Sequence, residues 1–158
     1  MEFSKNPLVS IWIPTYNNGH LISKAILSAI HQTYKNIEII VFDDASSDNT
    51  ETIVQEFVKK DKRVKYFKTE KNIGINKSYV QILERCRGEL AIFLCSDDWL
   101  SKNFIEECVN IFMKYPGTGA VTGRAFSITE KNGKYFFSRE PDIKPGRYSR
   151  EYFGRNAY

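Results

Sequence analysis

The sequence predicts an α/β fold: a Rossmann-like, mostly parallel central sheet with helices on both faces. Two observations predict this fold class. Short apolar runs alternate with longer stretches in which apolar residues recur every three or four positions. The apolar runs are also nearly continuous, as in strands that are covered on both faces. We therefore expect right-handed crossover connections between neighbouring parallel strands.

The first elements follow from this pattern in chain order. Residues 8–14 form an apolar run that is closed by a proline, which predicts a buried strand. Residues 20–32 have the periodicity of a helix that covers the sheet, and residues 37–42 predict the second strand. The sequence Asp48-Asn-Thr-Glu51 is typical of a helix start in which Asp48 caps the helix and Glu51 reaches back. That helix should run to about residue 60.

The remaining elements continue the alternation and end in a β-hairpin. We predict strands over residues 64–67, 90–94 and 120–128, and helices over residues 75–85 and 104–115. Lys131-Asn-Gly-Lys134 predicts a hairpin turn into a strand at residues 135–137, because Asn-Gly accepts the positive φ that such turns require. From residue 140 onward the sequence is polar and basic, so we expect little packing there.

Composition excludes several classes of protein. The chain has 158 residues, 42% of them hydrophobic, and a net charge of +4, which is an ordinary globular balance for one domain. The apolar runs are far shorter than the roughly 20 residues of a membrane span, and the amino terminus lacks the apolar stretch of a signal peptide. The three cysteines have no CxxC spacing, which predicts free thiols. We expect a cytoplasmic protein.

Polar and acidic residues gather directly after the predicted strands. Pro14-Thr-Tyr-Asn-Asn-Gly19 follows the first strand, Asp43-Asp44 the second, Asn72-Ile-Gly74 the third and Ser96-Asp97-Asp98 the fourth. Ligands of such sheets bind beyond the carboxyl ends of the strands, where the strand order switches. Crowded carboxylates repel each other, and a divalent cation such as Mg²⁺ or Mn²⁺ relieves that repulsion. The sequence therefore predicts a metal–diphosphate site.

Neither GxGxxG nor GxxxxGK[ST] occurs, which argues against a dinucleotide dehydrogenase and a P-loop NTPase.

Some of the candidate site residues could instead have a structural role. We expect Asp43 to brace its turn while Asp44 faces the ligand, and Asn17 and Asn72 could equally form turns. We expect Trp99 to pack rather than to bind ligand.

Four segments together resemble the amino-terminal, nucleotide-binding part of the family 2 glycosyltransferases, which are inverting enzymes of GT-A fold. The segments are residues 9–17 (VSIWIPTYN), 32–50 (QTYKNIEIIVFDDASSDNT), 72–74 (NIG) and 93–100 (FLCSDDWL), in the order of the family. The resemblance covers about residues 8–121.

The resemblance implies a nucleotide-diphosphate sugar as donor, most often a UDP-sugar. Tyr16 would stack on the base and Asp44 would accept a hydrogen bond from a base imide N–H. Asp97 and Asp98 would hold the ribose and a Mn²⁺ or Mg²⁺ ion, which stabilises charge on the departing diphosphate. The nucleotide-binding residues implied in this way are Pro14, Thr15, Tyr16, Asn17, Asp44, Asn72, Lys77 and Asp97, and the metal-binding residues are Asp97 and Asp98.

The chain departs from the family pattern at three places. Cys95 stands at the first position of the usual Asp-x-Asp-Asp motif, and which of Asp97 and Asp98 is the direct ligand stays open. Tyr79-Val80 replaces an Arg-Asn pair, and Lys77 could substitute in contacting phosphate. No residue matches the family's general base, so we expect a truncated chain that binds donor and transfers little. Residues 1–128 would be the donor-binding domain and 129–158 the start of an incomplete acceptor-side region.

The expected partners are the donor and a polysaccharide, glycolipid or glycoprotein acceptor, without nucleic acid. Peripheral association with the inner face of the cell membrane is compatible with this function. The alternative is a nucleotide-sugar-binding module without transfer activity. A phospho-acceptor receiver domain ranks last, because Lys68-Thr-Glu70 follows the third strand where an isolated acceptor Asp would be needed.

Overall fold

The computed structural model describes residues 3–121, 123, 126–131 and 134–139. The chain divides into two units, Met1–Val121 and Thr122–Tyr158. Each unit is described by itself.

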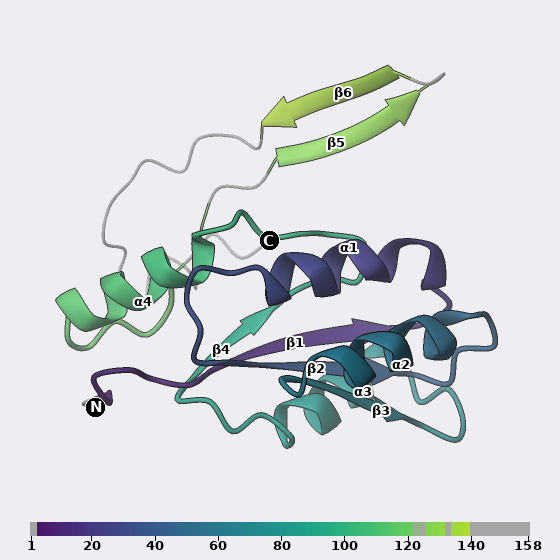
Figure 1. Cartoon of the computed structure of the whole chain (residues 1–158), viewed down its shortest axis with the longest axis horizontal. Helices are drawn as coiled ribbons and strands as arrows, with labels where there is room; N and C mark the ends of the chain where they lie inside the picture. Colours follow the sequence, from purple (N-terminus) through teal and green to yellow (C-terminus); the bar gives the residue numbers. More distant parts are fainter. Residues whose placement is uncertain (1–2, 122, 124–125, 132–133, 140–158) are drawn as a thin grey trace. The chain divides into compact units, whose positions relative to one another are not determined.

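The first unit is built on a four-stranded sheet in which every neighbouring pair is parallel (Figure 1). Its strands are β1 (Val9–Thr15), β2 (Ile37–Asp43), β3 (Val64–Lys68) and β4 (Leu90–Phe93), in the spatial order β3-β2-β1-β4. All four strands were predicted from their apolar runs, with ends that differ by one residue. The predicted parallel α/β architecture is confirmed.

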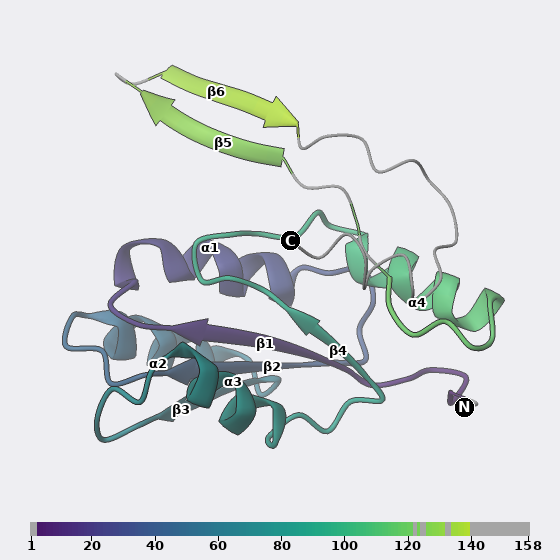
Figure 2. The ribbon, with the colours of Figure 1, turned by 180° about the vertical axis from the view of Figure 1, so that it is seen from behind.

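Four helices connect and cover these strands: α1 (Gly19–Ile30), α2 (Thr50–Lys60), α3 (Ile75–Leu83) and α4 (Phe104–Lys114). The chain moves outward from β1 to β3, and α3 then returns it to β4 on the other side of β1. Because crossovers are right-handed, this reversal puts α3 on the opposite face of the sheet from α1 and α2. Figures 1 and 2 show this arrangement from two sides.

Alternate residues of the central strands build two separate cores. Ile11, Ile13 and Ile39 belong to the larger core, which includes the inner faces of α1 and α2. Ile40 and Phe42 point to the other face and pack with Ile82 of α3, beside Trp12. Since successive side chains of a strand point to opposite faces, the nearly continuous apolar runs supply both cores at once.

The predicted cap of α2 is wrong in its position. Asn49 is the capping residue and its side chain makes no capping bond, because the first bond of the helix runs from the N–H of Ile53 to its carbonyl oxygen. Asp48 lies one residue earlier, and its Oδ1 accepts a 2.9 Å hydrogen bond from the N–H of Thr50, the first residue of the helix. The expectation that Glu51 reaches back to the cap is wrong. Glu51 pairs instead with Lys68 of β3, at 2.8 Å, because the neighbouring strand brings an ammonium group within its reach.

The buried side chain of Gln32 joins the end of α1 to the segment that leads into α4. Its Nε2 donates to the carbonyl oxygen of Ser101 at 2.8 Å, and its Oε1 accepts from the N–H of Ile105 at 3.0 Å. A buried polar side chain is stable only when such bonds are made. Gln32 therefore fixes the chain that follows the acidic residues at the end of β4.

The structure bears on the expected state of the cysteines and on the expected lack of a membrane span. Cys86, Cys95 and Cys108 are all free thiols, as predicted. Among the described residues, no helix has both the length and the apolar character that crossing a membrane requires.

The second unit contains an antiparallel hairpin of β5 (Phe126–Lys131) and β6 (Lys134–Arg139). Lys131 lies opposite Lys134, in agreement with the predicted turn, whose central residues 132–133 lie outside the described residues. The strand expected over residues 120–128 is wrong in its bounds. Pairing with β6 moves it to Phe126–Lys131, and Ala120 and Val121 lie outside any strand.

Candidate functional site

A cavity of about 400 Å³ lies at the carboxyl ends of the strands, where the strand order switches between β1 and β4. The last residue of β1 that pairs with β4 is Trp12, and β1 continues past it to Thr15. The two strands therefore separate beyond this point, which leaves room for a ligand. The cavity is lined by Pro14, Thr15, Tyr16, Asn18, Asp44, Asn72, Gly74, Ile75, Ser78, Tyr79, Phe93, Cys95, Ser96 and Asp97.

The β1 side of the cavity offers an aromatic ring and an unsatisfied hydroxyl. Tyr16 is 53% exposed, so its ring is available for stacking. Thr15 is buried, and within the described residues its hydroxyl oxygen has no hydrogen-bond partner. Buried polar atoms are nearly always satisfied. An unsatisfied hydroxyl in the wall of a cavity indicates a place where a polar ligand or water completes the structure.

Asp44 is held in the cavity wall by the loop that precedes α3. Its Oδ1 accepts hydrogen bonds from the N–H of Ile73 at 2.8 Å and the hydroxyl of Thr69 at 3.2 Å. Its Oδ2 accepts one from the N–H of Gly74 at 2.9 Å. A carboxylate has about four acceptor positions, so one position on Oδ2 remains for a donor in the cavity.

Asp43, next to it, has the bracing role that was expected from the sequence. This fully buried carboxylate accepts from the N–H of Ser46 at 2.7 Å and the hydroxyl of Tyr66 at 2.6 Å. It does not line the cavity. Asp43 therefore stabilises its loop, whereas the neighbouring Asp44 lines the cavity.

The acidic turn after β4 brings three possible ligand atoms together. One ligand atom each from Cys95, Asp97 and Asp98 lie within 4.8 Å of one another. The N–H of Asp98 donates to the carbonyl oxygen of Cys95 at 3.1 Å, which closes the turn. Both carboxylates are exposed, and no Lys or Arg in the described part of the chain forms an ion pair with either of them.

The chemistry of these donors fits a hard divalent cation. Burial, together with the charges of Asp98 and Asp97, raises the pKa of the Cys95 thiol to about 11, so this group is neutral at pH 7. A neutral thiol is a poor metal ligand, which leaves two carboxylates as the ligands offered by the turn. Mg²⁺ and Mn²⁺ are commonly held by one or two carboxylates together with phosphate oxygens.

Some of the site residues expected from the sequence line the cavity, and others do not. Those that line the cavity are Pro14, Thr15, Tyr16, Asp44, Asn72 and Asp97. Asp98 adjoins Asp97 in the acidic turn, whereas Lys77 is exposed on α3 and Asn17 bonds to another loop. The expectation that Trp99 packs is wrong: it is 50% exposed, with the Lys24 ammonium 5.7 Å from its ring centre, because it follows a turn that leaves the sheet.

Several lining residues were not found from the sequence. Tyr79 and Phe93 form an aromatic wall, with ring centres 5.5 Å apart, and Phe93 also contacts Trp12 at 4.6 Å. Asn18 and Ser96 also line the cavity and are joined by a 2.7 Å hydrogen bond. The only signal for Asn18 was its place beside Asn17, and the contact with Ser96 has no local signal.

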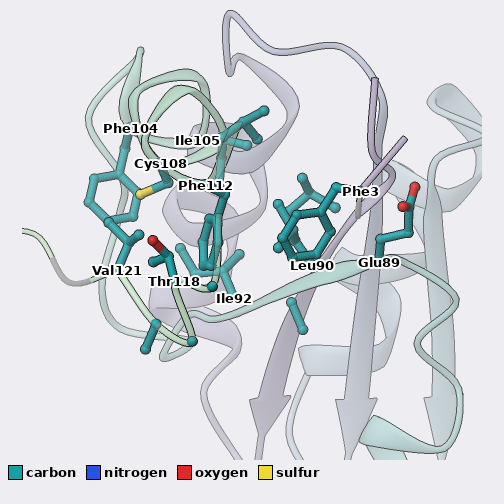
Figure 3. A pocket seen from close by; sticks show the side chains of 16 residues that line it. Phe3, Glu89, Leu90, Ile92, Phe104, Ile105, Cys108, Phe112, Thr118 and Val121 are labelled. Carbon is teal, nitrogen blue, oxygen red and sulfur yellow. The ribbon is translucent and has the colours of Figure 1, made fainter. Parts of the chain in front are cut away.

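A second cavity, of about 470 Å³, has no comparable chemistry. It lies between β4 and α4, shares no residue with the first cavity and is lined mainly by apolar side chains such as Phe3, Leu90 and Phe112 (Figure 3). Glu89 is the one ionised carboxylate in its lining. The candidate site is therefore the cavity at the carboxyl ends of the strands.

Comparison with known proteins agrees with this assignment. A glucosyltransferase of Campylobacter jejuni, GalNAc(5)-diNAcBac-PP-undecaprenol beta-1,3-glucosyltransferase, is 29% identical over 96% of this chain and 58% of that protein. An uncharacterised glycosyltransferase of Rickettsia typhi is 36% identical over 92% of this chain and 44% of that protein. Glycosyltransferase GlyA of Streptococcus pneumoniae is 33% identical over 82% and 18%. The chain thus spans less than two thirds of each relative.

Solved structures show the same architecture. S. aureus TarS 1–349 in complex with UDP matches with a TM-score of 0.63 and 26% identity, over 72% of this chain and 38% of that one. The same protein in complex with UDP-GlcNAc matches with the same TM-score and identity, over 72% and 37%. The model of the glycosyl transferase family 2 matches residues 10–157. With a parallel sheet of this order and its acidic residues at the carboxyl ends of the strands, the chain belongs to glycosyl transferase family 2.

Proposed function

We propose that this chain binds a nucleotide-diphosphate sugar, with a UDP-sugar preferred, together with Mn²⁺ or Mg²⁺. The whole protein would transfer the sugar, with inversion, to a polysaccharide, glycolipid or glycoprotein acceptor. One observation carries the proposal: Asp44 and Asp97, which are far apart in the sequence, line the same cavity, and Asp98 adjoins Asp97. The complexes of TarS with UDP and UDP-GlcNAc support this class of ligand.

The nucleoside half of the ligand would lie against β1 and β2. The exposed ring of Tyr16 stacks on the base, and the remaining acceptor position of Asp44 receives the imide N–H. Uracil carries this proton, whereas adenine and cytosine do not. The buried Thr15 hydroxyl supports the proposal, because a ligand in this place can satisfy it.

The diphosphate half would lie beside the acidic turn. Asp97 and Asp98 hold the metal, and their exposed carboxylates face solvent without a lysine or arginine partner in the described residues. When bound, the cation stabilises the charge that develops on the departing diphosphate. Asn17, Asn72 and Lys77 remain proposed contacts of the nucleotide, and only Asn72 of these three lines the cavity.

Donor binding and transfer are proposed for different lengths of chain. Between 18% and 58% of each relative named above is spanned here, and we assign no general base to any residue. Transfer is therefore proposed for the whole protein, and this chain alone would bind donor and transfer little. We further propose that residues 1–128 form the donor-binding domain and that residues 129–158 begin the acceptor-side region. The protein would be cytoplasmic, and peripheral association with the inner face of the cell membrane is compatible with this function.

Isothermal titration of this chain with UDP, UDP-sugars, GDP and ADP, with and without Mn²⁺, tests the proposal. We expect UDP or a UDP-sugar to bind more tightly than ADP, and Mn²⁺ to increase the affinity. Asp98→Asn should remove the Mn²⁺ effect. Glu84→Gln is the matched control, because Glu84 is an exposed acid outside the cavity.

Three results would contradict parts of this proposal. Equal affinity for UDP and ADP would remove the role of Asp44 in recognising the base. An undiminished Mn²⁺ effect in Asp98→Asn would remove the metal role of that residue. No binding of any nucleotide by the unchanged chain would overturn the proposed function as a whole.

A further inference from the structure

Two consecutive asparagines in the loop between β1 and α1 bond to two different acidic segments. Asn17 bonds to Ser46 and Ser47, which closely follow Asp44. Asn18 bonds to Ser96, which directly precedes Asp97. One dipeptide therefore contacts both of the loops that supply carboxylates to the cavity.

Asn17 forms hydrogen bonds with the β2–α2 loop through both its backbone and its side chain. Its N–H donates to the hydroxyl of Ser46 at 2.8 Å, and its Oδ1 accepts from the N–H of Ser47 at 2.8 Å. The backbone of Asn17 is left-handed where these bonds form, with φ at +50°. Asparagine tolerates this conformation better than most residues, which gives a physical reason for its presence at this position.

Asn18 is the residue before the first turn of α1, but its side chain does not cap that helix. The free N–H of Gly19 is bonded instead to Oδ2 of Asp48 from the neighbouring loop, at 3.0 Å. The side chain of Asn18 is thereby left to donate to the hydroxyl of Ser96 at 2.7 Å. Its backbone is fixed, because its carbonyl oxygen accepts from Leu21 and Ile22 at the start of the helix.

The acidic turn has few other restraints. Before it, the N–H of Leu94 donates to the carbonyl oxygen of Trp12, and after it, the N–H of Leu100 donates to the hydroxyl of Ser28. Within residues 95–99, the bond from Asn18 is the one hydrogen bond to another loop of the described chain. Asp97 and Asp98 carry like charges that repel, and this bond adds a restraint from another loop to the bond between Asp98 and Cys95 that closes the turn.

We propose that Asn17 and Asn18 are positioning residues that set the nucleoside half and the metal half of the site separately. Asn17 holds the loop of Asp44, and Asn18 holds Ser96 and with it the carboxylates of Asp97 and Asp98. This inference rests on the proposed function, because it assigns the two halves of the cavity to nucleoside and metal. The inference goes further than the proposed function in one respect: nucleoside binding and metal binding can each be weakened by a variant that leaves the other largely intact.

Titration of UDP with and without Mn²⁺ tests the inference in three variants. Asn18→Ala and Ser96→Ala should reduce the gain in affinity from Mn²⁺ about tenfold, the usual effect of losing a partner that orients metal ligands. Their metal-free affinity for UDP should fall by a much smaller factor. Asn17→Gly keeps the left-handed backbone and removes the amide, so it should lower the affinity by the same factor with and without Mn²⁺.

Two controls separate positioning from a general loss of stability. Asn103→Ala removes an asparagine that likewise precedes a helix, α4. Among the residues that the structure describes, its side chain bonds to Glu107 alone, so both affinities should stay unchanged. Ser96→Thr keeps the hydroxyl acceptor and should restore the Mn²⁺ gain. Hydrogen exchange should be faster at the N–H of Asp98 in Asn18→Ala than in the unchanged chain, without any ligand.

The outcomes distinguish this inference from the proposed function. If the unchanged chain binds UDP with a Mn²⁺ gain and Asn18→Ala keeps that gain, the inference is overturned and the proposed function stands. If Asn18→Ala lowers both affinities equally, the bond is only structural and the inference is again overturned. If the unchanged chain binds no UDP, the proposed function fails and this inference fails with it.

Discussion

The hydroxyl of Tyr66 donates a 2.6 Å hydrogen bond to Oδ2 of Asp43, the residue that directly precedes Asp44. Asp43 is fully buried, and its other oxygen accepts from the N–H of Ser46. Burial and the neighbouring Asp43 carboxylate raise the pKa of Tyr66, so its hydroxyl stays a donor at physiological pH. This pair fixes the end of β2 at the edge of the cavity.

Tyr66→Phe should lower the free energy of unfolding by about 2 kcal/mol, because it leaves one oxygen of a buried carboxylate without its donor. Urea denaturation measures this change. Tyr79→Phe is the control, since the Tyr79 ring packs against Trp12 and Phe93 while its hydroxyl makes no hydrogen bond in the described residues. Equal stability of the two variants would show that the Tyr66–Asp43 bond contributes nothing.

A second buried carboxylate, Glu38, joins three segments at the other end of the sheet. It accepts from Ser10 Oγ, from the N–H of Arg87 and from Lys65 Nζ, each at 2.7 Å. Burial acts to raise the pKa of Glu38, but the bonds from Lys65, Arg87 and Ser10 outweigh it and leave the pKa below its ordinary value. The ionised form is therefore the one that stabilises the fold.

Glu38→Gln should lower the free energy of unfolding at pH 7 by about 2 kcal/mol, the scale of hydrogen bonds to a charged group. Because the folded pKa is lowered, this contribution is complete above the unfolded pKa, about 4.3, and is lost as pH falls through the folded value. The difference between the two proteins should therefore shrink below about pH 4, as measured by urea denaturation across pH. Glu56→Gln removes an exposed pair with Lys60 and should change little at any pH.

Gly19 lies where the starts of α1 and α2 approach each other. A Cβ atom there would lie 2.1 Å from Asn49 Oδ1 and 3.0 Å from the backbone nitrogen of Thr50. The side chain can move, but the backbone cannot without displacing α2. Gly19→Ala should therefore destabilise the protein by about 1 kcal/mol in urea denaturation, although alanine favours helices. Gly119→Ala meets no atom within 4 Å and should not destabilise it.

Cys95→Asp tests the neutral thiol of the acidic turn. A third carboxylate beside Asp97 and Asp98 adds a hard ligand, so the affinity for Mn²⁺ in the presence of UDP should rise about tenfold. Without metal, the added repulsion should lower thermal stability. Cys95→Ser adds no charge and should show neither effect. A similar gain for both variants would argue against charge as the cause.

Local pattern predicted the repeating part of the fold because burial on both faces of a parallel sheet demands continuous apolar runs. Helix ends were less exact: the helix expected over residues 75–85 ends at Leu83. The start of α2 is encoded locally and was predicted to within two residues, although its capping residue is Asn49 and not Asp48. The pairing of Glu51 with Lys68 was missed, since it depends on β3 lying beside α2.

For the site, the residue order was enough to predict which carboxylates follow strands, because parallel strands deliver their carboxyl ends to one edge of the sheet. Which side chains bind to one another there depends on the three-dimensional packing of the loops. The contact of Asn18 with Ser96 spans 78 positions, and the Thr15 hydroxyl is buried without a hydrogen-bond partner among the described residues. Such contacts depend on how separate loops pack, and no short sequence pattern encodes that geometry.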